Sequence, residues 1–240
     1  MSECVAAEWE SNEGLRARAA LHAALAEPAR LAIVDELVLS DRSPGELVER
    51  LSMPSNLLAH HLDVLQRAGL VTRSPSAGDG RRRYVRLVGP TVVDATPVAP
   101  VGEVVFLCTH NSARSQLAAA MWRERTGLKA TSAGTRPADR VHRGAVAAAR
   151  RAGLSLQGAA PRCLGDIPAG AQVVTVCDLV HEELSAGPGW WHWSIADPVG
   201  DGSDRAFDAV VRELDARIAP FAALARTTTE RPVGRARGTR

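Results

Sequence analysis

The chain has 240 residues, of which 45% are hydrophobic and 23% are charged, and its formal net charge is +2. This length is enough for two modest domains, and the composition is ordinary for a soluble globular protein. A net charge this close to zero does not by itself indicate a nucleic acid, a membrane or any other charged partner. Arginines nevertheless gather at residues 81–86 and 226–240.

The N-terminal residues, MSECVAAEWESNEGLR, include several acidic side chains and no long apolar run. They do not resemble a secretory signal peptide, and we expect residues 1–14 to be disordered. No apolar stretch approaches the ~18 residues that suggest a membrane-spanning helix. The sequence therefore predicts a cytoplasmic protein with no membrane partner.

The cysteines are widely spaced and form no C-x-x-C pair; they are Cys4, Cys108, Cys163 and Cys177. This spacing favours neither a structural zinc site nor a disulfide framework, and the histidines show no ligand spacing either. We therefore expect no bound metal.

The first part of the chain has the pattern of several short helices. Pro28 suits the first turn of one helix, Ser43 is the expected N-cap of the next, and Gly69 ends the last. Residues 71–88 then indicate two short strands around a turn rich in glycine, aspartate and serine. The order of elements predicts a mostly α winged helix-turn-helix domain over residues 15–88.

The text HHLDVLQRAGLV, followed by an arginine-rich hairpin, resembles the winged-helix repressors of the arsenical-resistance (ArsR) family. The resemblance implies a homodimer that reads a double-stranded DNA operator, with a recognition helix in the major groove and the hairpin against phosphates. The alternative for the arginines is a solvent-exposed charged face with no partner. The alternative for His61 is a buried residue that packs in the core. The candidate DNA contacts are Ser55, Asn56, His60, His61, Arg81, Arg82 and Arg83.

Two features depart from that family. Soft-metal sensors of this type use paired cysteines, but residues 5–107 contain none, so direct thiolate sensing is not expected. The family also dimerises through a helix after the wing, whereas residues 89–102 have the composition of a proline-containing linker. The dimer interface must then come from the first helix or from the second domain.

After the linker the pattern changes to strands that alternate with helices, over residues 103–224. This alternation predicts a three-layer α/β domain with a four-stranded parallel sheet, whose ligand lies at the carboxyl ends of the strands. Residues 225–240 are expected to form a basic, flexible tail. The expected strands cover residues 103–107, 128–135, 171–177 and 192–195, and the expected helices cover residues 115–127, 142–153, 181–184 and 203–225.

Cys108 directly follows the first of these strands, and Arg114 opens the next helix. The spacing lets the loop curl around one tetrahedral oxyanion, with backbone N–H groups and the helix dipole pointing inward. Arg114 adds a planar fork for two oxygens, and the same field favours the thiolate of Cys108. Ser115 is placed to give its hydroxyl to the sulfur. The alternative is an inert buried cysteine.

The stretch CTHNSARS after VVFL resembles the low-molecular-weight protein tyrosine phosphatase superfamily, over residues 103–222. The resemblance implies that Cys108 is the nucleophile, that Arg114 clamps the oxyanion and that Ser115 stabilises the thiolate. It also implies a general acid, which Asp197 in ADPVG supplies unless it is an ordinary turn residue. The implied oxyanion-binding residues are Thr109, His110, Asn111, Ser112, Ala113 and Arg114, with Asn111 holding the loop in a strained shape.

The stretches CTHNSARS, SAGTRP and HWSIADP look more like the arsenate reductase branch than the phosphatase branch. The pair of tyrosines that often follows Asp-Pro in the phosphatases is absent, since the chain's one tyrosine lies in the wing. We therefore expect a repressor fused to a thiol-dependent arsenate reductase that binds arsenate or a phosphate-type oxyanion. The alternatives are a tyrosine phosphatase and a non-turnover oxyanion-sensing repressor.

Arsenate reduction needs a second thiol after the attack by Cys108. Cys177, at the end of the third expected strand of the α/β domain, is a possible resolving thiol and equally a possible inert core residue. No further cysteine follows it, so the intramolecular relay is incomplete. The alternative to Cys177 is an external thiol that releases arsenite from the Cys108 adduct. This reductant is either a low-molecular-weight thiol or a thioredoxin- or glutaredoxin-like protein, and no bound cofactor is expected.

Overall fold

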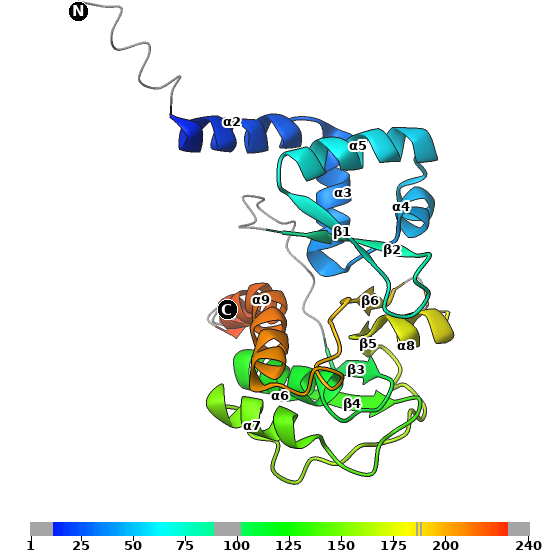
Figure 1. Cartoon of the computed structure of the whole chain (residues 1–240), viewed down its shortest axis with the longest axis vertical. Helices are drawn as coiled ribbons and strands as arrows, with labels where there is room; N and C mark the ends of the chain where they lie inside the picture. Colours follow the sequence, from blue (N-terminus) through cyan, green and yellow to red (C-terminus); the bar gives the residue numbers. More distant parts are fainter. Residues whose placement is uncertain (1–11, 89–101, 186, 188, 230–240) are drawn as a thin grey trace, which may run out of the picture. The chain divides into compact units, whose positions relative to one another are not determined.

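The computed structural model describes residues 12–88, 102–185, 187 and 189–229 (Figure 1). The chain divides into two compact units, one before and one after the junction of Thr96 with Pro97. This division lies inside the expected linker, residues 89–102, of which only residue 102 is described. Each unit is taken in turn.

The N-terminal unit has four helices followed by a two-stranded antiparallel hairpin among its described residues, as the sequence predicts. The elements are α2 (Glu13–Leu25), α3 (Pro28–Leu39), α4 (Pro44–Leu51), α5 (Ser55–Arg67), β1 (Val71–Pro75) and β2 (Arg83–Leu87).

Local chemistry fixes helix α4, which precedes α5. Ser43 caps α4 through its side chain, and Glu46 completes a capping box by accepting from the Ser43 backbone N–H at 2.7 Å. The helix places Leu47 in a core shared with Ile33 and Leu65, all three fully buried. Each such side chain contributes roughly 1.5–3 kcal/mol of transfer free energy, so this core holds the helices and the hairpin together.

The C-terminal unit alternates strands and helices, and its four strands form a parallel sheet in the order β4-β3-β5-β6. This confirms the predicted three-layer α/β architecture. The elements are β3 (Val104–Cys108), α6 (Arg114–Thr126), β4 (Ala130–Gly134), α7 (Arg143–Arg151), β5 (Gln172–Thr175), α8 (Asp178–Glu183), β6 (Trp191–His192) and α9 (Asp204–Thr229).

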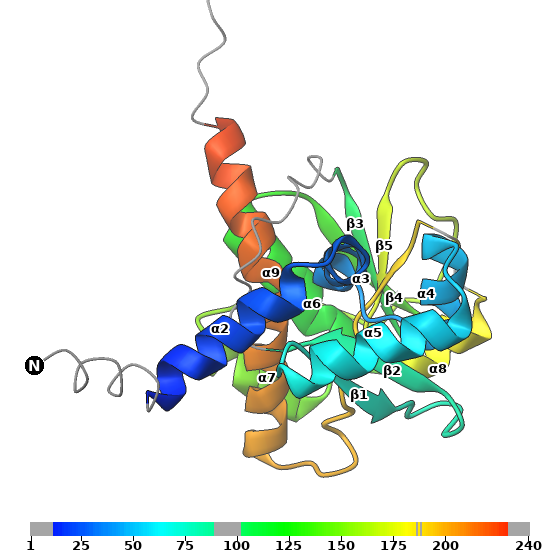
Figure 2. The same cartoon turned by 90° about the horizontal axis from the view of Figure 1, so that it is seen from above.

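Strand β3 lies inside this sheet and is buried along its whole length. Helix α6 packs against β3, β4 and α9, while α8 packs against β3 and β5 on the side away from α9 (Figure 2). Phe106 of β3 contacts Trp122 of α6 with ring centroids 5.9 Å apart. The core thus holds the end of β3 and the start of α6 in fixed positions.

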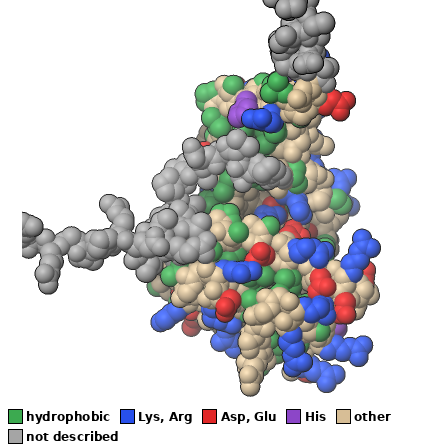
Figure 3. All heavy atoms as spheres, turned by 90° about the vertical axis from the view of Figure 1, so that its left-hand side faces the viewer, with side chains coloured by type: hydrophobic (Ala, Val, Ile, Leu, Met, Phe, Trp, Pro, Cys, Tyr) green, Lys and Arg blue, Asp and Glu red, His purple; other side chains and the backbone are tan. Residues whose placement is uncertain are grey.

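The surface of the C-terminal unit carries basic and acidic side chains interspersed on the face that Figure 3 shows. Arg125 of α6 pairs with Asp215 of α9, and Arg151 of α7 pairs with Asp208 of α9. Exposed pairs of this kind contribute little to stability.

Two predicted boundaries differ from the structure. Helix α2 begins at Glu13, inside the expected disordered segment 1–14, and α9 continues to Thr229, so the expected tail 225–240 begins as helix. Residues 1–11 and 230–240 lie outside the described residues. No helix among the described residues is long and apolar enough to cross a membrane.

Candidate active site

The loop of residues 109–113 joins the end of β3 to the start of α6 at the carboxyl edge of the sheet. Edges of this kind bind ligands in open parallel sheets. The loop lies at the first turn of α6, a helix of 13 residues whose unpaired N–H groups and dipole favour a negative charge.

Asn111 is the residue at which the loop reverses, with a φ of 47° in the left-handed region. Its side-chain oxygen accepts hydrogen bonds from Gln116 Nε2 at 3.1 Å and from the Arg162 backbone N–H at 2.9 Å. Two donors on the oxygen fix the orientation of the amide, so its nitrogen faces Ser115 and donates to Ser115 Oγ at 2.8 Å.

Ser115 Oγ lies 3.0 Å from Cys108 Sγ. Because this oxygen accepts from Asn111 through one lone pair, its hydroxyl hydrogen is free to be donated to the sulfur. Asn111, Ser115 and Cys108 therefore form one chain of hydrogen bonds that ends on the sulfur.

The segment of residues 134–142 holds the outer side of the loop. The backbone N–H groups of Arg136 and His142 donate to the carbonyls of Thr109 and Ser112 at 2.9 and 2.8 Å. These carbonyls therefore point outward, which leaves the loop's N–H groups available for an anion. Gly134 packs so closely that a Cβ atom there would lie 2.6 Å from the Thr109 carbonyl oxygen.

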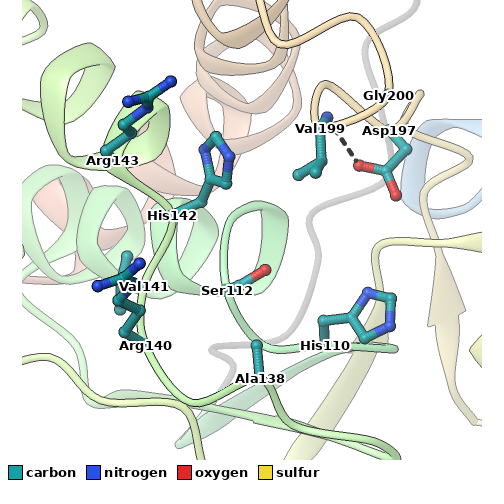
Figure 4. Close-up of a pocket in the computed structure, with 10 residues that line it drawn as sticks. All are labelled: His110, Ser112, Ala138, Arg140, Val141, His142, Arg143, Asp197, Val199 and Gly200. Atoms are coloured by element: carbon teal, nitrogen blue, oxygen red, sulfur yellow. Dashed lines mark hydrogen bonds between the residues drawn. The ribbon is translucent and has the colours of Figure 1, made fainter.

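Arg114 is buried at the start of α6 and makes two specific hydrogen bonds. Its Nη1 donates to the Ile195 carbonyl at 3.0 Å, and its Nη2 donates to Asp197 Oδ2 at 2.8 Å. The other carboxylate oxygen of Asp197 accepts from the Val199 backbone N–H at 3.1 Å, as Figure 4 shows. Arg114 thus brings the aspartate, 83 residues away in sequence, to the loop.

A pocket of about 840 Å³ opens beside Asp197 (Figure 4). Residues 140–143 line one side, and residues 197, 199 and 200 line the opposite side, with Ser112 of the loop between them. His142 is held in this wall because it caps α7 and stacks on Phe207, with ring centroids 5.0 Å apart. No tyrosine, tryptophan or phenylalanine lines the pocket as the structure describes it.

Comparison with known families gives one match for each unit. The pattern of the low molecular weight phosphotyrosine protein phosphatase family matches residues 103–231, more than half of the chain. The pattern of a helix-turn-helix domain matches residues 25–74.

The chain belongs to the low molecular weight phosphotyrosine protein phosphatase family. Its N-terminal part is similar to the HTH-type transcriptional repressor SmtB of Mycobacterium tuberculosis, with 42% identity over 95 residues, which cover 38% of this chain and 67% of the relative. An uncharacterized HTH-type transcriptional regulator of the same species is 34% identical over 91 residues, covering 38% and 77%. The chain is thus an ArsR/SmtB-type DNA-binding regulator fused to a phosphatase-family enzyme domain.

Solved structures similar to the phosphatase-family domain include two kinds of enzyme. The tyrosine phosphatase Wzb from Escherichia coli K30 is 23% identical, covers 51% of this chain and 97% of its own, and has a TM-score of 0.46. The thioredoxin-dependent arsenate reductase of Corynebacterium glutamicum is 26% identical, covers 55% and 65%, and has a TM-score of 0.43.

Cys177 of the phosphatase-family domain lies between β5 and α8, next to the loop. Its Sγ is 3.5 Å from Thr109 Oγ1, and only 2% of the residue is exposed. Burial raises the pKa of the Cys177 thiol, although Arg114 and the Thr109 hydroxyl act in the opposite direction. The structure therefore brings the second candidate thiol close to the first, in an environment that favours its neutral form.

Buried polar side chains continue beyond Cys177. His192 is fully buried and contacts Asp178 at 3.0 Å and Thr175 Oγ1 at 2.9 Å, and its ring stacks on His181. These contacts hold α8 against the sheet. The described residues contain no group of three or more histidine, cysteine, aspartate or glutamate side chains arranged for a metal ion.

In the repressor domain, the candidate DNA contacts divide by exposure. Ser55, Asn56 and His60 are exposed on α5, and residues 81–83 are exposed on the hairpin. His61 instead is buried, with its Nδ1 3.7 Å from a Glu27 carboxylate oxygen. This position favours the packing alternative for His61.

Sequence reasoning missed Gln116, which links the loop to the segment around Ala160 as well as to Asn111. The available signal in the sequence was its position directly after Arg114 and Ser115. A polar side chain in the first turn of the helix lies close enough to the loop to hydrogen-bond with Asn111. The close approach of Gly134 had no sequence signal beyond the glycine itself.

Replacement of Ser115 by alanine is expected to slow alkylation of Cys108 by iodoacetamide at pH 7. The lost hydrogen bond to a charged sulfur corresponds to roughly a tenfold change in rate. Mass spectrometry of the Cys108 peptide gives the rate separately from the other cysteines. Ser112→Ala is the matched control, since that side chain faces the pocket; equal rates in the two variants would contradict the assignment.

Proposed function

We propose that the phosphatase-family domain reduces arsenate, with Cys108 as the nucleophile and an external thiol as the reductant. The observation that carries this proposal is the pocket beside Asp197, whose described lining contains no tyrosine, tryptophan or phenylalanine. The only ring side chains there for a phosphotyrosine ring to stack on are the imidazoles of His110 and His142. Arsenate needs no such wall, because the loop alone surrounds a tetrahedral oxyanion.

In this mechanism the anion binds to the N–H groups of the loop and to the guanidinium of Arg114. Arsenate oxygens compete with Asp197 for Arg114 Nη2, and the anion thereby releases the aspartate from its ion pair. Cys108 Sγ attacks arsenic and forms a sulfur–arsenic bond. Asp197, which takes up a proton once the anion has displaced it from Arg114, gives that proton to the departing oxygen, which leaves as water.

The adduct still holds arsenic in its oxidised state, so a second thiol must supply the remaining electron pair. Cys177 is a poor nucleophile for this attack, because the residue is buried and burial raises the pKa of its thiol. An external thiol is the better reductant, and the domain then needs no bound cofactor.

For the N-terminal domain we propose repression of transcription by a homodimer on a double-stranded DNA operator, in the cytoplasm. The exposed start of α5 lies in the major groove, and the exposed arginines at residues 81–83 contact phosphates. Similarity to a repressor and the exposure of these side chains support this proposal.

The test of the enzyme is arsenite production by the full chain, with dithiothreitol as a general reductant. The native protein is expected to form arsenite. Cys108→Ser is expected to form none, because a serine oxygen cannot form the disulfide with the external thiol through which arsenic receives its electrons. Cys163→Ser, at an exposed cysteine, is the matched control and keeps full activity. Hydrolysis of an aromatic phosphate ester without arsenite production would refute the reductase in favour of a phosphatase.

Asp197→Asn is expected to lower kcat for arsenate by about 10²–10⁴-fold, since the amide cannot donate an acidic proton to the leaving oxygen. Inhibition by inorganic phosphate should persist, because the loop and Arg114 stay in place. Asp201→Asn changes an exposed aspartate of the same loop region and serves as control. An equal loss in both variants would mean that the carboxyl of Asp197 is not the proton donor.

Simultaneous replacement of Arg81, Arg82 and Arg83 by alanine is expected to weaken operator binding and to flatten its salt dependence. Each lost phosphate contact reduces the slope of log K against log salt by roughly 0.9. Gel-shift titration at several salt concentrations measures the slope. Alanine at Arg150, Arg205 and Arg212, exposed in the other domain, is the control; a slope equal to that of the native protein in the wing variant would exclude phosphate contacts there.

A further inference from the structure

The pocket beside Asp197 is larger than the proposed oxyanion requires. Pockets of roughly 300–1,000 Å³ hold whole organic ligands, and this one has a volume of about 840 Å³. Arsenate occupies the loop, so the pocket is free for a second molecule at the same time. His110 and Ser112 of the loop line it, which places such a molecule next to the segment that carries Cys108.

The wall opposite Asp197 is positively charged. Arg140 and Arg143 both line the pocket, and both are exposed. Within the described part of the chain, no acidic side chain forms an ion pair with either of them, in contrast to Arg136 with Glu183 and Arg151 with Asp208. Two unneutralised guanidinium groups with a fork of donors are suited to carboxylates.

The remaining lining is His142 together with the small or aliphatic residues Ala138, Val141, Val199 and Gly200. Such a lining accepts a flexible chain of modest polarity between the charged wall and the loop. Figure 4 shows the basic residues and Asp197 on opposite sides of the opening. A bound molecule that places its anionic groups at Arg140 and Arg143 therefore has its other end near Ser112 and the loop.

We propose that this pocket binds the external reductant, and that the reductant is a low-molecular-weight thiol bearing carboxylate groups. The inference rests on the proposed arsenate reduction and specifies its second substrate.

The electrons balance with two equivalents of this thiol. The first, as thiolate, attacks Cys108 Sγ; the sulfur–sulfur bond forms, and the sulfur–arsenic bond breaks with its electron pair going to arsenic. Arsenic leaves as arsenite, reduced by two electrons, and Cys108 remains in a mixed disulfide with the donor. The second equivalent attacks the donor's sulfur in that disulfide, releases the donor disulfide and restores the Cys108 thiolate.

The first experiment measures arsenite production by the full chain with glutathione, which carries carboxylates, and with uncharged 2-mercaptoethanol. The double variant Arg140→Ala/Arg143→Ala is expected to raise KM for glutathione about tenfold, with KM for 2-mercaptoethanol and kcat at saturating donor unchanged. Arg150→Ala/Arg205→Ala, exposed and outside the pocket, is the charge-matched control. Equal effects on both donors, or none on glutathione, would overturn the proposal.

A second experiment needs no arsenate and so separates the pocket from the reductase activity. Glutathione disulfide should form a mixed disulfide at Cys108 faster than uncharged hydroxyethyl disulfide, and the pocket variant alone should lose this preference. Mass spectrometry of the Cys108 peptide measures both rates. Absence of arsenite with every donor, together with a preserved preference, would reject arsenate reduction but retain the thiol pocket. No preference in the native protein, or efficient turnover with thioredoxin alone, would reject the pocket.

Discussion

The left-handed backbone at Asn111 is the constraint on which the site depends. A non-glycine residue in this region costs on the order of 1 kcal/mol or more, and three hydrogen bonds of its side chain offset that cost. The reversal lets the end of β3 and the start of α6 face one point. Without this reversal, Cys108 and the first N–H groups of α6 would not be directed at the same position.

The same loop organises its surroundings. Its outward carbonyls are hydrogen-bonded by residues 134–142, so the backbone of residues 109–113 also fixes the wall of the neighbouring pocket. Gly134 allows this segment to approach without a side chain. The loop of residues 109–113 and the pocket wall of residues 140–143 are therefore joined by backbone hydrogen bonds, and a change in the position of one alters the other.

Much of this could be predicted from local sequence. A buried strand that ends in a cysteine, followed by an arginine that opens a helix, was enough to predict the loop of residues 109–113. The capping role of Ser43 could likewise be predicted from the sequence alone. Contacts between distant segments were harder. The ion pair of Arg114 with Asp197 depends on how the chain returns after β6, and the burial of His61 depends on which face of α5 meets the core. The end of α9 also lies beyond the expected one, since residues 225–229 contain neither proline nor glycine to stop the helix.

Two neighbouring parallel strands each lead to a buried cysteine, and the difference between these cysteines is environmental. Cys108 receives a directed hydroxyl and faces the start of a 13-residue helix. Cys177 precedes a helix of only six residues, and burial dominates its pKa. Proximity of two thiols alone therefore does not make a relay, because an attacking sulfur must also be ionised. The proposed two-thiol reduction therefore takes its second thiol from solution, and the charged pocket beside Asp197 is where we propose that this thiol binds.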